Sequence, residues 1–277
     1  MTHRVVSAVP LVHTAAGPTV ELWVEAPEVA RSWQPGQFVI VRSGEGAERI
    51  PLTIVDGRES TGQIRLVVQQ VGKSTRDLVS LTTGGEIADV CGPLGQPSEI
   101  SNFGTCVLVA GGYGSAAVLP IARALTEVGN RVIGIVGART ADLVILASEF
   151  AACVMDLHVM TDDGSLGSEG NVLVPLRELL DGERVDRVLA VGPIRMMEAV
   201  AKVTEPLGTP TVVSPNPIMV DGTGMCGACR FHANGNLYFA CVDGPEFDAH
   251  GVDFDELVER LGTFRSQEAK AFGACGG

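Results

Sequence analysis

The stretch Thr105-Cys-Val-Leu-Val-Ala-Gly-Gly-Tyr-Gly114 decides the fold of the central part of the chain. Its first six residues are apolar or small without alternation, which predicts a strand buried on both faces. The glycines that follow predict a tight turn, and the pattern of residues 116–128 indicates a helix that ends at Gly129. Parallel, doubly wound sheets are built from this unit of strand, turn and helix.

Three further strands are expected at residues 132–136, 157–161 and 187–191. The last of them runs through Gly192 and Pro193 into a helix. Strands that alternate with helices predict a doubly wound parallel sheet, which we assign to residues 98–215. Glycine turns at the carboxyl edge of such a sheet let amides approach the pyrophosphate of a dinucleotide. A glycine needed only for helix–strand packing is an equally good explanation, because the full G-x-G-x-x-G pattern is absent.

Residues 1–97 show a different pattern of short β-rich runs separated by turn signals. These runs occupy residues 20–25, 37–41, 64–70 and 86–90. Several strands at this spacing predict a small antiparallel barrel. One helix is expected at residues 74–81, and Gly72-Lys-Ser-Thr75 at its start could offer amides and hydroxyls to an anion. Alternatively, Ser74 or Thr75 simply caps the helix.

Composition indicates a globular protein and argues against nucleic acid as its partner. The chain has 277 residues, 45% of them hydrophobic and 19% charged, which is ordinary for a globular enzyme of two or three domains. Its net charge of −13 argues against nucleic acid as a partner, because affinity for phosphate comes from Lys and Arg.

Cysteine usage and the apolar runs bear on the compartment. The seven cysteines are odd in number and most of them are scattered along the chain. This usage fits a protein of the reducing cytoplasm. The N-terminus shows no signal-peptide pattern, and the most apolar run, residues 106–122, is interrupted by glycines and therefore predicts no membrane span.

A second stretch carries the chemistry: Asp221-Gly-Thr-Gly-Met-Cys226-Gly-Ala-Cys229, followed by Cys241. Three cysteines in a glycine-rich loop can converge on one metal centre, and Asp221 stands where a C-x4-C-x2-C pattern would place a fourth ligand of a two-iron cluster. The alternatives are a zinc site that includes His232, or uncoordinated thiols. Asp221 could also form only an Asx turn.

The last part, residues 216–277, continues beyond the cysteines with an amphipathic pattern at residues 252–261. We expect a helix there that faces the core under the cysteine loop and has Gly262 as its C-cap. Cys275, close to the end of the chain, is expected to be a bystander.

Together these stretches resemble the small flavin subunit of NADH-dependent ferredoxin:NADP oxidoreductase. Relatives in the ferredoxin-reductase superfamily are the electron-transfer subunits of dihydroorotate dehydrogenase and sulfide dehydrogenase. The motifs that carry the resemblance, in order, are Arg49-Ile-Pro-Leu-Thr53, Val71-Gly-Lys-Ser-Thr75, Gly92-Pro-Leu-Gly95, Gly111-Gly-x-Gly114, Thr161-Asp-Asp-Gly-Ser165, Val191-Gly-Pro193 and the D-x4-C-x2-C-x11-C site.

The resemblance implies three domains that each hold one cofactor. Residues 1–97 would be an FAD barrel, residues 98–215 would bind NAD(H) or NADP(H), and residues 216–277 would carry a [2Fe-2S] cluster. The implied flavin-binding residues are Arg49, Ile50, Pro51, Leu52, Thr53, Val67, Val68, Gln69, Gly72, Ser74 and Thr75. The implied nucleotide-binding residues are Gly111, Gly112, Gly114, Arg139, Asp162, Gly192 and Pro193. The implied cluster ligands are Asp221, Cys226, Cys229 and Cys241.

The function implied is an electron-transfer subunit of a larger, cytoplasmic oxidoreductase, which also fits an electron-bifurcating complex. Its partner would be a large flavin and iron–sulfur subunit similar to the glutamate synthase small subunit, with ferredoxin as a further partner. Asp221 favours the ferredoxin:NADP type, since the dihydroorotate type has a fourth cysteine there; dihydroorotate or sulfide dehydrogenase is the alternative. A redox-sensing module without turnover would need the same motifs. No side-chain acid or base is expected, because hydride transfer requires only alignment.

Overall fold

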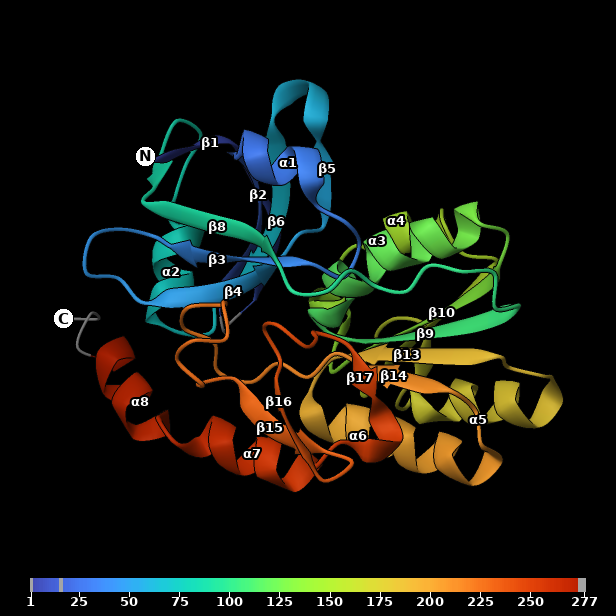
Figure 1. Ribbon diagram of the computed structural model, residues 1–277. Helices are drawn as coiled ribbons and strands as arrows, with labels where there is room; N and C mark the ends of the chain where they lie inside the picture. The colour runs from blue at the N-terminus through green and yellow to red at the C-terminus, as the bar shows by residue number, and fades with distance from the viewer. Residues whose placement is uncertain (1, 15–16, 274–277) are drawn as a thin grey trace.

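The computed structural model describes residues 2–14 and 17–273 (Figure 1). Its β-rich N-terminal part consists of two antiparallel sheets. The first has the order β5 (Asp56–Arg58), β6 (Gln63–Gln69), β2 (Gly17–Glu25), β1 (His3–Thr14) and β7 (Glu86–Ile87). The second has the order β4 (Arg49–Thr53), β3 (Phe38–Arg42) and β8 (Asp89–Leu94). Both sheets contribute to one core, which includes Leu22, Val39, Leu52 and Leu66.

The antiparallel β-rich arrangement of this part confirms the prediction, with local differences. Helix α2 (Lys73–Val79) is present as expected, but a second helix, α1 (Pro27–Ser32), was missed because six residues are too short to show a helical period. The predicted strand at residues 86–90 is divided, because β7 pairs with β1 whereas β8 pairs with β3. Residues 86–87 and 89–90 therefore belong to different sheets, with Ala88 between them.

The central sheet has seven strands among the described residues. Its order is β12 (Ser168–Glu169), β11 (Asp156–Thr161), β10 (Arg131–Ala138), β9 (Thr105–Gly111), β13 (Arg187–Val191), β14 (Thr211–Val213) and β17 (Phe247–Asp248). All neighbouring pairs are parallel except β14 with β17. Strand β9 lies in the middle, and residues 106–111 are buried, as its unbroken apolar run predicts.

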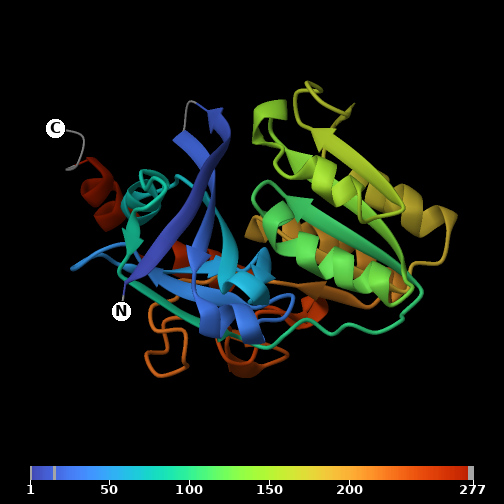
Figure 2. The same cartoon turned by 90° about the horizontal axis from the view of Figure 1, so that it is seen from above.

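Helices cover both faces of this sheet (Figures 1 and 2). Helices α3 (Gly114–Glu127) and α4 (Ala147–Ala151) pack on one face, where their side chains share a core cluster with Leu108 and Val136. Helices α5 (Leu173–Gly182) and α6 (Ile194–Thr204) pack on the other face with Val107 and Val109. Alternate residues of β9 thus face opposite helical layers, which is the doubly wound arrangement expected.

The cysteine-rich C-terminal part joins the open edge of the central sheet. Strand β17 pairs with β14, and Phe247 on β17 contacts Phe231 edge to face with ring centroids 4.8 Å apart. Phe231 belongs to a hairpin of β15 (Arg230–Ala233) and β16 (Asn236–Phe239). Helices α7 (Phe254–Gly262) and α8 (Arg265–Gly273) follow.

Helix α7 confirms the predicted core-facing helix, since Phe254 and Leu257 are buried. The predicted C-cap at Gly262 is wrong: Gly262 is the last helical residue, and the cap is Thr263 in a right-handed conformation. Short 3₁₀ turns occupy Glu59–Thr61, Ala141–Leu143, Glu205–Leu207 and Ala249–Gly251. None of the described helices has the length and hydropathy needed to cross a membrane.

Candidate cofactor and cluster site

Two glycine turns meet at the carboxyl edge of the central sheet. One follows β9 and the other follows β13. A Cβ atom on Gly192 would lie 2.9 Å from the Cα atom of Gly111, and a Cβ atom on Gly114 would lie 2.0 Å from the carbonyl oxygen of Val191. No larger residue fits at these positions without moving the backbone. The packing explanation therefore holds for Gly111, Gly114 and Gly192.

Gly112 differs from its neighbours. Its φ of +52° lies in the left-handed region that favours glycine, and a Cβ atom there would meet no atom within 4 Å. Its amide donates a hydrogen bond to the carbonyl of Gly137 at 2.7 Å, so the turn is tied to β10 while its outer side stays open. Open space beside a fixed backbone is what an approaching ligand requires.

The other nucleotide candidates lie along the same edge. The end of β10 pairs with the end of β11, and the amide of Asp162 donates to the carbonyl of Ala138 at 3.0 Å. Arg139, directly after β10, is exposed, as is Asp162. Pro193 uses its carbonyl to accept the amides of the first turn of α6. The carboxyl edge thus brings together the candidates that are far apart in the sequence.

Tyr113 is a residue of this edge that the sequence analysis missed. Its hydroxyl donates a hydrogen bond to the carbonyl of Val67 on β6, so it connects the nucleotide side to the β-rich part. Burial raises the pKa of Tyr113, which keeps the hydroxyl protonated as a donor. The signal in the sequence was an aromatic residue inside a glycine turn, where a small residue would suffice.

The candidates on the β-rich side differ in what their side chains contact. Leu52, Val67 and Val68 are buried among apolar residues, so only their backbone groups can meet a cofactor. Arg49 is exposed, and Thr53 and Gln69 are half-buried, which leaves their side chains available. Strand β4 itself is fixed through antiparallel pairing with β3.

The turn before α2 shows how Ser74 and Thr75 are used. The hydroxyl of Thr75 accepts the amides of Val71 at 2.9 Å and Gly72 at 3.0 Å, so Thr75 does cap its own helix. Ser74 instead donates to the carboxylate of Glu48 at 3.0 Å. A hollow of about 300 Å³ lies beside these residues, lined by residues 43–47 and by Lys73, Asp77 and Leu81.

The cysteine loop is held open by Asp221. Its two carboxylate oxygens accept the amides of Thr223 and Cys226, each at 2.8 Å. Hydrogen bonds to an ionised carboxylate are stronger than those between neutral groups, so these bonds fix the loop. They also lower the pKa of Asp221, with the Thr223 amide as the largest cause. The Asx turn is therefore present, and each oxygen keeps a further lone pair for a metal.

Two of the three thiols already meet. The sulfur atoms of Cys229 and Cys241 are 3.3 Å apart and buried. Two thiolates at ~2.3 Å from one tetrahedral metal would be roughly 3.8 Å apart, so the two sulfur atoms would have to separate by about 0.5 Å to bind the same metal ion. Burial, with the neighbouring thiol of Cys229 as the next cause, raises the pKa of Cys241. The thiol of Cys226 is exposed at the surface of the loop.

The donor set fits an iron–sulfur cluster better than zinc. Asp221, Cys226 and Cys229 lie in one loop, in which Gly222, Gly224 and Gly227 have positive φ, and Cys241 follows the hairpin of β15 and β16. His232 lies on the exposed face of β15, where its ring pairs with Glu256 at 3.0 Å. In the part of the chain that the structure covers, no three ligand-type side chains converge on one point. Cys275 lies outside that part.

Helix α7 supports the loop from below, as expected. The Arg260 guanidinium donates to the carbonyl of Ala228, between Cys226 and Cys229, at 3.0 Å. The loop is thus connected to a helix whose apolar face is buried in the core.

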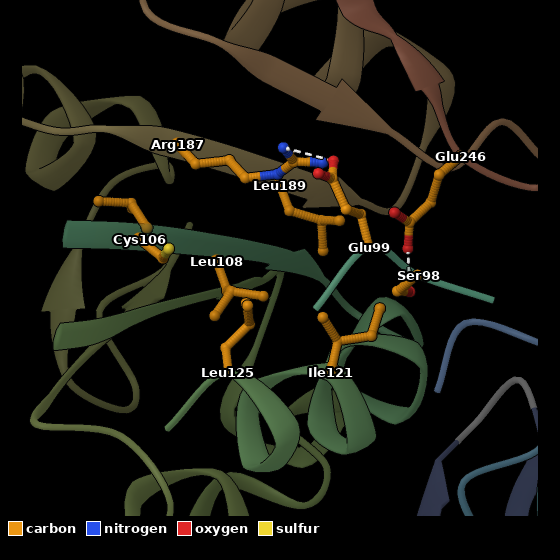
Figure 3. Close-up of a pocket in the computed structure, with 10 residues that line it drawn as sticks. Ser98, Glu99, Cys106, Leu108, Ile121, Leu125, Arg187, Leu189 and Glu246 are labelled. Atoms are coloured by element: carbon orange, nitrogen blue, oxygen red, sulfur yellow. Dashed lines mark hydrogen bonds and ion pairs between the residues drawn. The ribbon is translucent and has the colours of Figure 1, made fainter. Parts of the chain in front are cut away.

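A small pocket of about 10 Å³ lies between the central sheet, α3 and Glu246 of the C-terminal part (Figure 3). Figure 3 shows Ser98 donating to the carboxylate of Glu246, and Arg187 paired with Glu99 at 3.1 Å. Burial raises the pKa of Glu246. The pocket has room for about one water molecule and none for a cofactor.

Comparison with known proteins finds relatives along nearly the whole chain. The family described as the iron-sulfur cluster binding domain of dihydroorotate dehydrogenase B matches residues 216–253. A dihydroorotate dehydrogenase B (NAD(+)) electron transfer subunit homolog of Thermotoga maritima is 48% identical and covers 90% of this chain and 88% of its own length. The electron transfer subunit of Bacillus caldolyticus is 35% identical, over 84% of this chain and 92% of its own.

Solved structures agree with these relatives. One from work on NADH-dependent reduced ferredoxin-NADP oxidoreductase and flavin-based electron bifurcation is 44% identical, with a TM-score of 0.90 over 98% of this chain and 97% of that one. The ferredoxin reductase in carbazole 1,9a-dioxygenase is 19% identical, with a TM-score of 0.61 over 76% of this chain and 65% of that one. The second likeness shows the fold alone.

Proposed function

The chain belongs to the family of dihydroorotate dehydrogenase B electron-transfer subunits and their homologues, and from this premise we propose that it passes electrons from a nicotinamide dinucleotide through FAD and a [2Fe-2S] cluster to a partner subunit. The observation that carries the proposal is the pair of buried thiols, Cys229 and Cys241, whose sulfur atoms lie 3.3 Å apart within the segment that matches the cluster-binding family. FAD, when bound, accepts a hydride and gives up its electrons singly.

The nucleotide is assigned to the carboxyl edge of the central sheet. Gly111, Gly114 and Gly192 let the two turns pack closely, while Gly112 leaves open space for the pyrophosphate. Arg139 and Asp162, with Pro193 at the neighbouring turn, would contact the rest of the nucleotide. These residues bind and orient; none of them needs to exchange a proton.

FAD is assigned to the β-rich part, between β4, β6 and the turn before α2. The residues proposed to hold it are Arg49, Ile50, Pro51, Leu52, Thr53, Val67, Val68, Gln69, Gly72, Ser74 and Thr75. Leu52, Val67 and Val68 would act through their backbone, since their side chains are in the core. Tyr113 in the nucleotide turn bonds Val67 and therefore lies between the proposed nucleotide and FAD sites.

The cluster ligands proposed are Asp221, Cys226, Cys229 and Cys241. A carboxylate is a harder ligand than a thiolate and favours the ferric state of its iron. The aspartate and the extensive likeness to the ferredoxin-NADP oxidoreductase structure favour that type of complex, including electron bifurcation. The match to the cluster domain of dihydroorotate dehydrogenase B keeps a subunit of that enzyme as the second candidate.

The chain is similar to proteins named electron transfer subunits, so a larger catalytic subunit is its expected partner. We infer a flavin and iron–sulfur subunit similar to the glutamate synthase small subunit, with ferredoxin as a further acceptor, in a reducing cytoplasm where free thiols persist. Exposed apolar side chains lie on and around the cysteine loop and its hairpin, namely Val220, Met225, Leu237 and Val242. Such a group of residues suits contact with another protein.

The first prediction tests the function itself. Purified protein should contain FAD and a two-iron cluster, and NADH should bleach the flavin absorbance and reduce a one-electron dye. Electrons from NADH should pass faster to the large subunit than to the dye. A protein that binds both cofactors but shows no bleaching is a redox-sensing module, and the enzyme proposal would then be wrong. Activity with dihydroorotate in place of NADPH and ferredoxin would select the second candidate.

The second prediction concerns the nucleotide turn. Gly112→Val places a β-branched side chain in the open space and in a left-handed conformation, so NADH should lose its access while the contents of FAD and cluster stay unchanged. The measurement is the rate of flavin bleaching by NADH. Gly182→Val, at the end of α5 where a Cβ atom also meets nothing, is the control and should bleach normally. Normal bleaching in both variants would place the dinucleotide elsewhere.

The third prediction separates Ser74 from Thr75. Ser74→Ala should lower flavin occupancy after gel filtration and leave the melting temperature nearly unchanged. Thr75→Ala removes the acceptor for two amides and should lower both quantities, at a cost of about 1 kcal/mol of stability. Ser80→Ala, at the other end of α2, serves as the control. Full flavin occupancy in Ser74→Ala would mean that the Ser74 hydroxyl of the wild type bonds Glu48 and does not help to hold the flavin.

The fourth prediction concerns Asp221. Asp221→Cys should keep a two-iron cluster with a changed electron paramagnetic resonance signal and potential, because sulfur replaces oxygen at one iron. Asp221→Ala should make the cluster labile and spare the flavin. Asp243→Ala is the matched control, since Asp243 also accepts a backbone amide close to the thiols, that of Phe239 at the end of β16, at 2.7 Å. Two results together would show that Asp221 is not a cluster ligand. They are identical resonance signals in the wild type and Asp221→Cys, and equal cluster lability in Asp221→Ala and Asp243→Ala.

A further inference from the structure

The outer face of β6 makes the contact between the β-rich part and the central sheet. Side chains alternate along a strand, so Arg65 and Val67 share this face. Val67 packs in the core cluster with residues of β9 and α3, and its carbonyl accepts the hydroxyl of Tyr113. Two residues away, Arg65 is 6% exposed and contacts Glu149 on α4. The flavin side and the nucleotide side are therefore joined at neighbouring positions of one strand.

Arg65 holds the two sides in a fixed geometry. Its Nη1 and Nη2 atoms donate to the two carboxylate oxygens of Glu149 at 2.8 and 2.7 Å, and its Nε atom donates to Glu21 on β2 at 2.8 Å. A planar guanidinium that bonds a carboxylate through two parallel N–H groups fixes orientation as well as distance. Glu149 cannot shift without breaking this pair.

A second ion pair joins the β-rich part to the helices of the central sheet, and here the arginine lies on the helix and the carboxylate on the β-rich side. Arg123 on α3 donates to Glu149 at 2.9 Å and lies 3.5 Å from the carboxylate of Asp56 on β5. Asp56 is the direct partner of Arg65 in the pairing of β5 with β6. The charges therefore alternate along a chain of Glu21, Arg65, Glu149, Arg123 and Asp56 that begins and ends in the β-rich part.

Both central groups of this chain stay ionised. Burial opposes the charge on Arg65, but hydrogen bonds to Glu149 and Glu21 outweigh it and raise the pKa of Arg65. The hydrogen bond from Arg65 is the largest cause that lowers the pKa of Glu149. A buried charge that loses its partner is strongly unfavourable, so this contact has one preferred arrangement.

We propose that the chain of charges from Glu21 to Asp56 sets the gap between β6 and the turn Gly111–Gly114, and so positions the nicotinamide against the flavin. The inference rests on the proposed function, which assigns FAD to β6 and the nucleotide to that turn. With both groups bound, the step that depends on this gap would be the transfer of a hydride, two electrons and one proton, from the reduced nicotinamide to the oxidised flavin. The five side chains are positioning residues, and a displacement of about 1 Å can slow such a step about 100-fold.

The test compares Glu149→Gln with Glu183→Gln. Glu183 pairs with Arg131 inside the parallel-sheet part, and its side chain is 32% exposed against 37% for Glu149. At saturating NADH, flavin bleaching in Glu149→Gln should be at least about tenfold slower than in the wild type, with KM within about threefold. Glu183→Gln should stay within about twofold of the wild-type rate.

A second readout needs no cofactor. In flavin-free protein, hydrogen exchange should become faster at residues 63–69 and 147–151 in Glu149→Gln but not in Glu183→Gln, since only the first variant opens the contact. Asp56→Asn, at the half-exposed end of the chain of charges, should change rate and exchange in the same direction. It keeps the test valid if Glu149→Gln does not fold.

Bleaching within about threefold of wild type in both Glu149→Gln and Asp56→Asn, or a slowing matched by Glu183→Gln, would overturn the proposal. A slowing that disappears at high NADH would also overturn it, because it would reflect nucleotide binding. Failure of the wild type to bleach would instead refute the proposed function, and the exchange contrast would still report on the contact.

Discussion

The close approach of two turns at the carboxyl edge of the central sheet is the constraint on which the rest of the structure depends. Gly111 and Gly192 bring the ends of β9 and β13 into backbone contact, and Gly114 starts α3 directly against Val191. Because nothing larger than hydrogen fits, the starts of α3 and α6 lie side by side. The positions of Gly112 and Pro193 at the nucleotide edge, and the reach of Tyr113 to β6, follow from this contact.

Patterns of local origin could be predicted from the sequence. The unbroken apolar run of β9, the helix after Gly114 and the core-facing residues of α7 all depend on neighbours in the sequence, and the structure has them. Helix α1 could not be predicted because six residues are too short to show a helical period. The division at Ala88 could not be predicted because it depends on which sheet each short segment joins. The cap at Gly262 failed because Thr263 continues in a right-handed conformation.

The candidate site was predictable in residue type but not in geometry. Spacing alone selected Cys229 and Cys241, whose thiols meet, but it could not show that Asp221 binds two loop amides as well. It also could not separate Gly112, which borders open space, from glycines that are required for packing. Arg65 and Glu149 are 84 positions apart, and nothing in either local sequence indicates that they pair.

The way β17 ends the central sheet affects how this chain meets other proteins. The outer strand of a sheet exposes unpaired amides and carbonyls that a foreign strand can extend, which leads to misassembly. Here an antiparallel segment covers β14, and at the opposite margin β12 has only two residues. Both margins are thus poor templates for strand addition. Contact with a partner at this sheet is then left to side chains, which can distinguish the right partner from a wrong one.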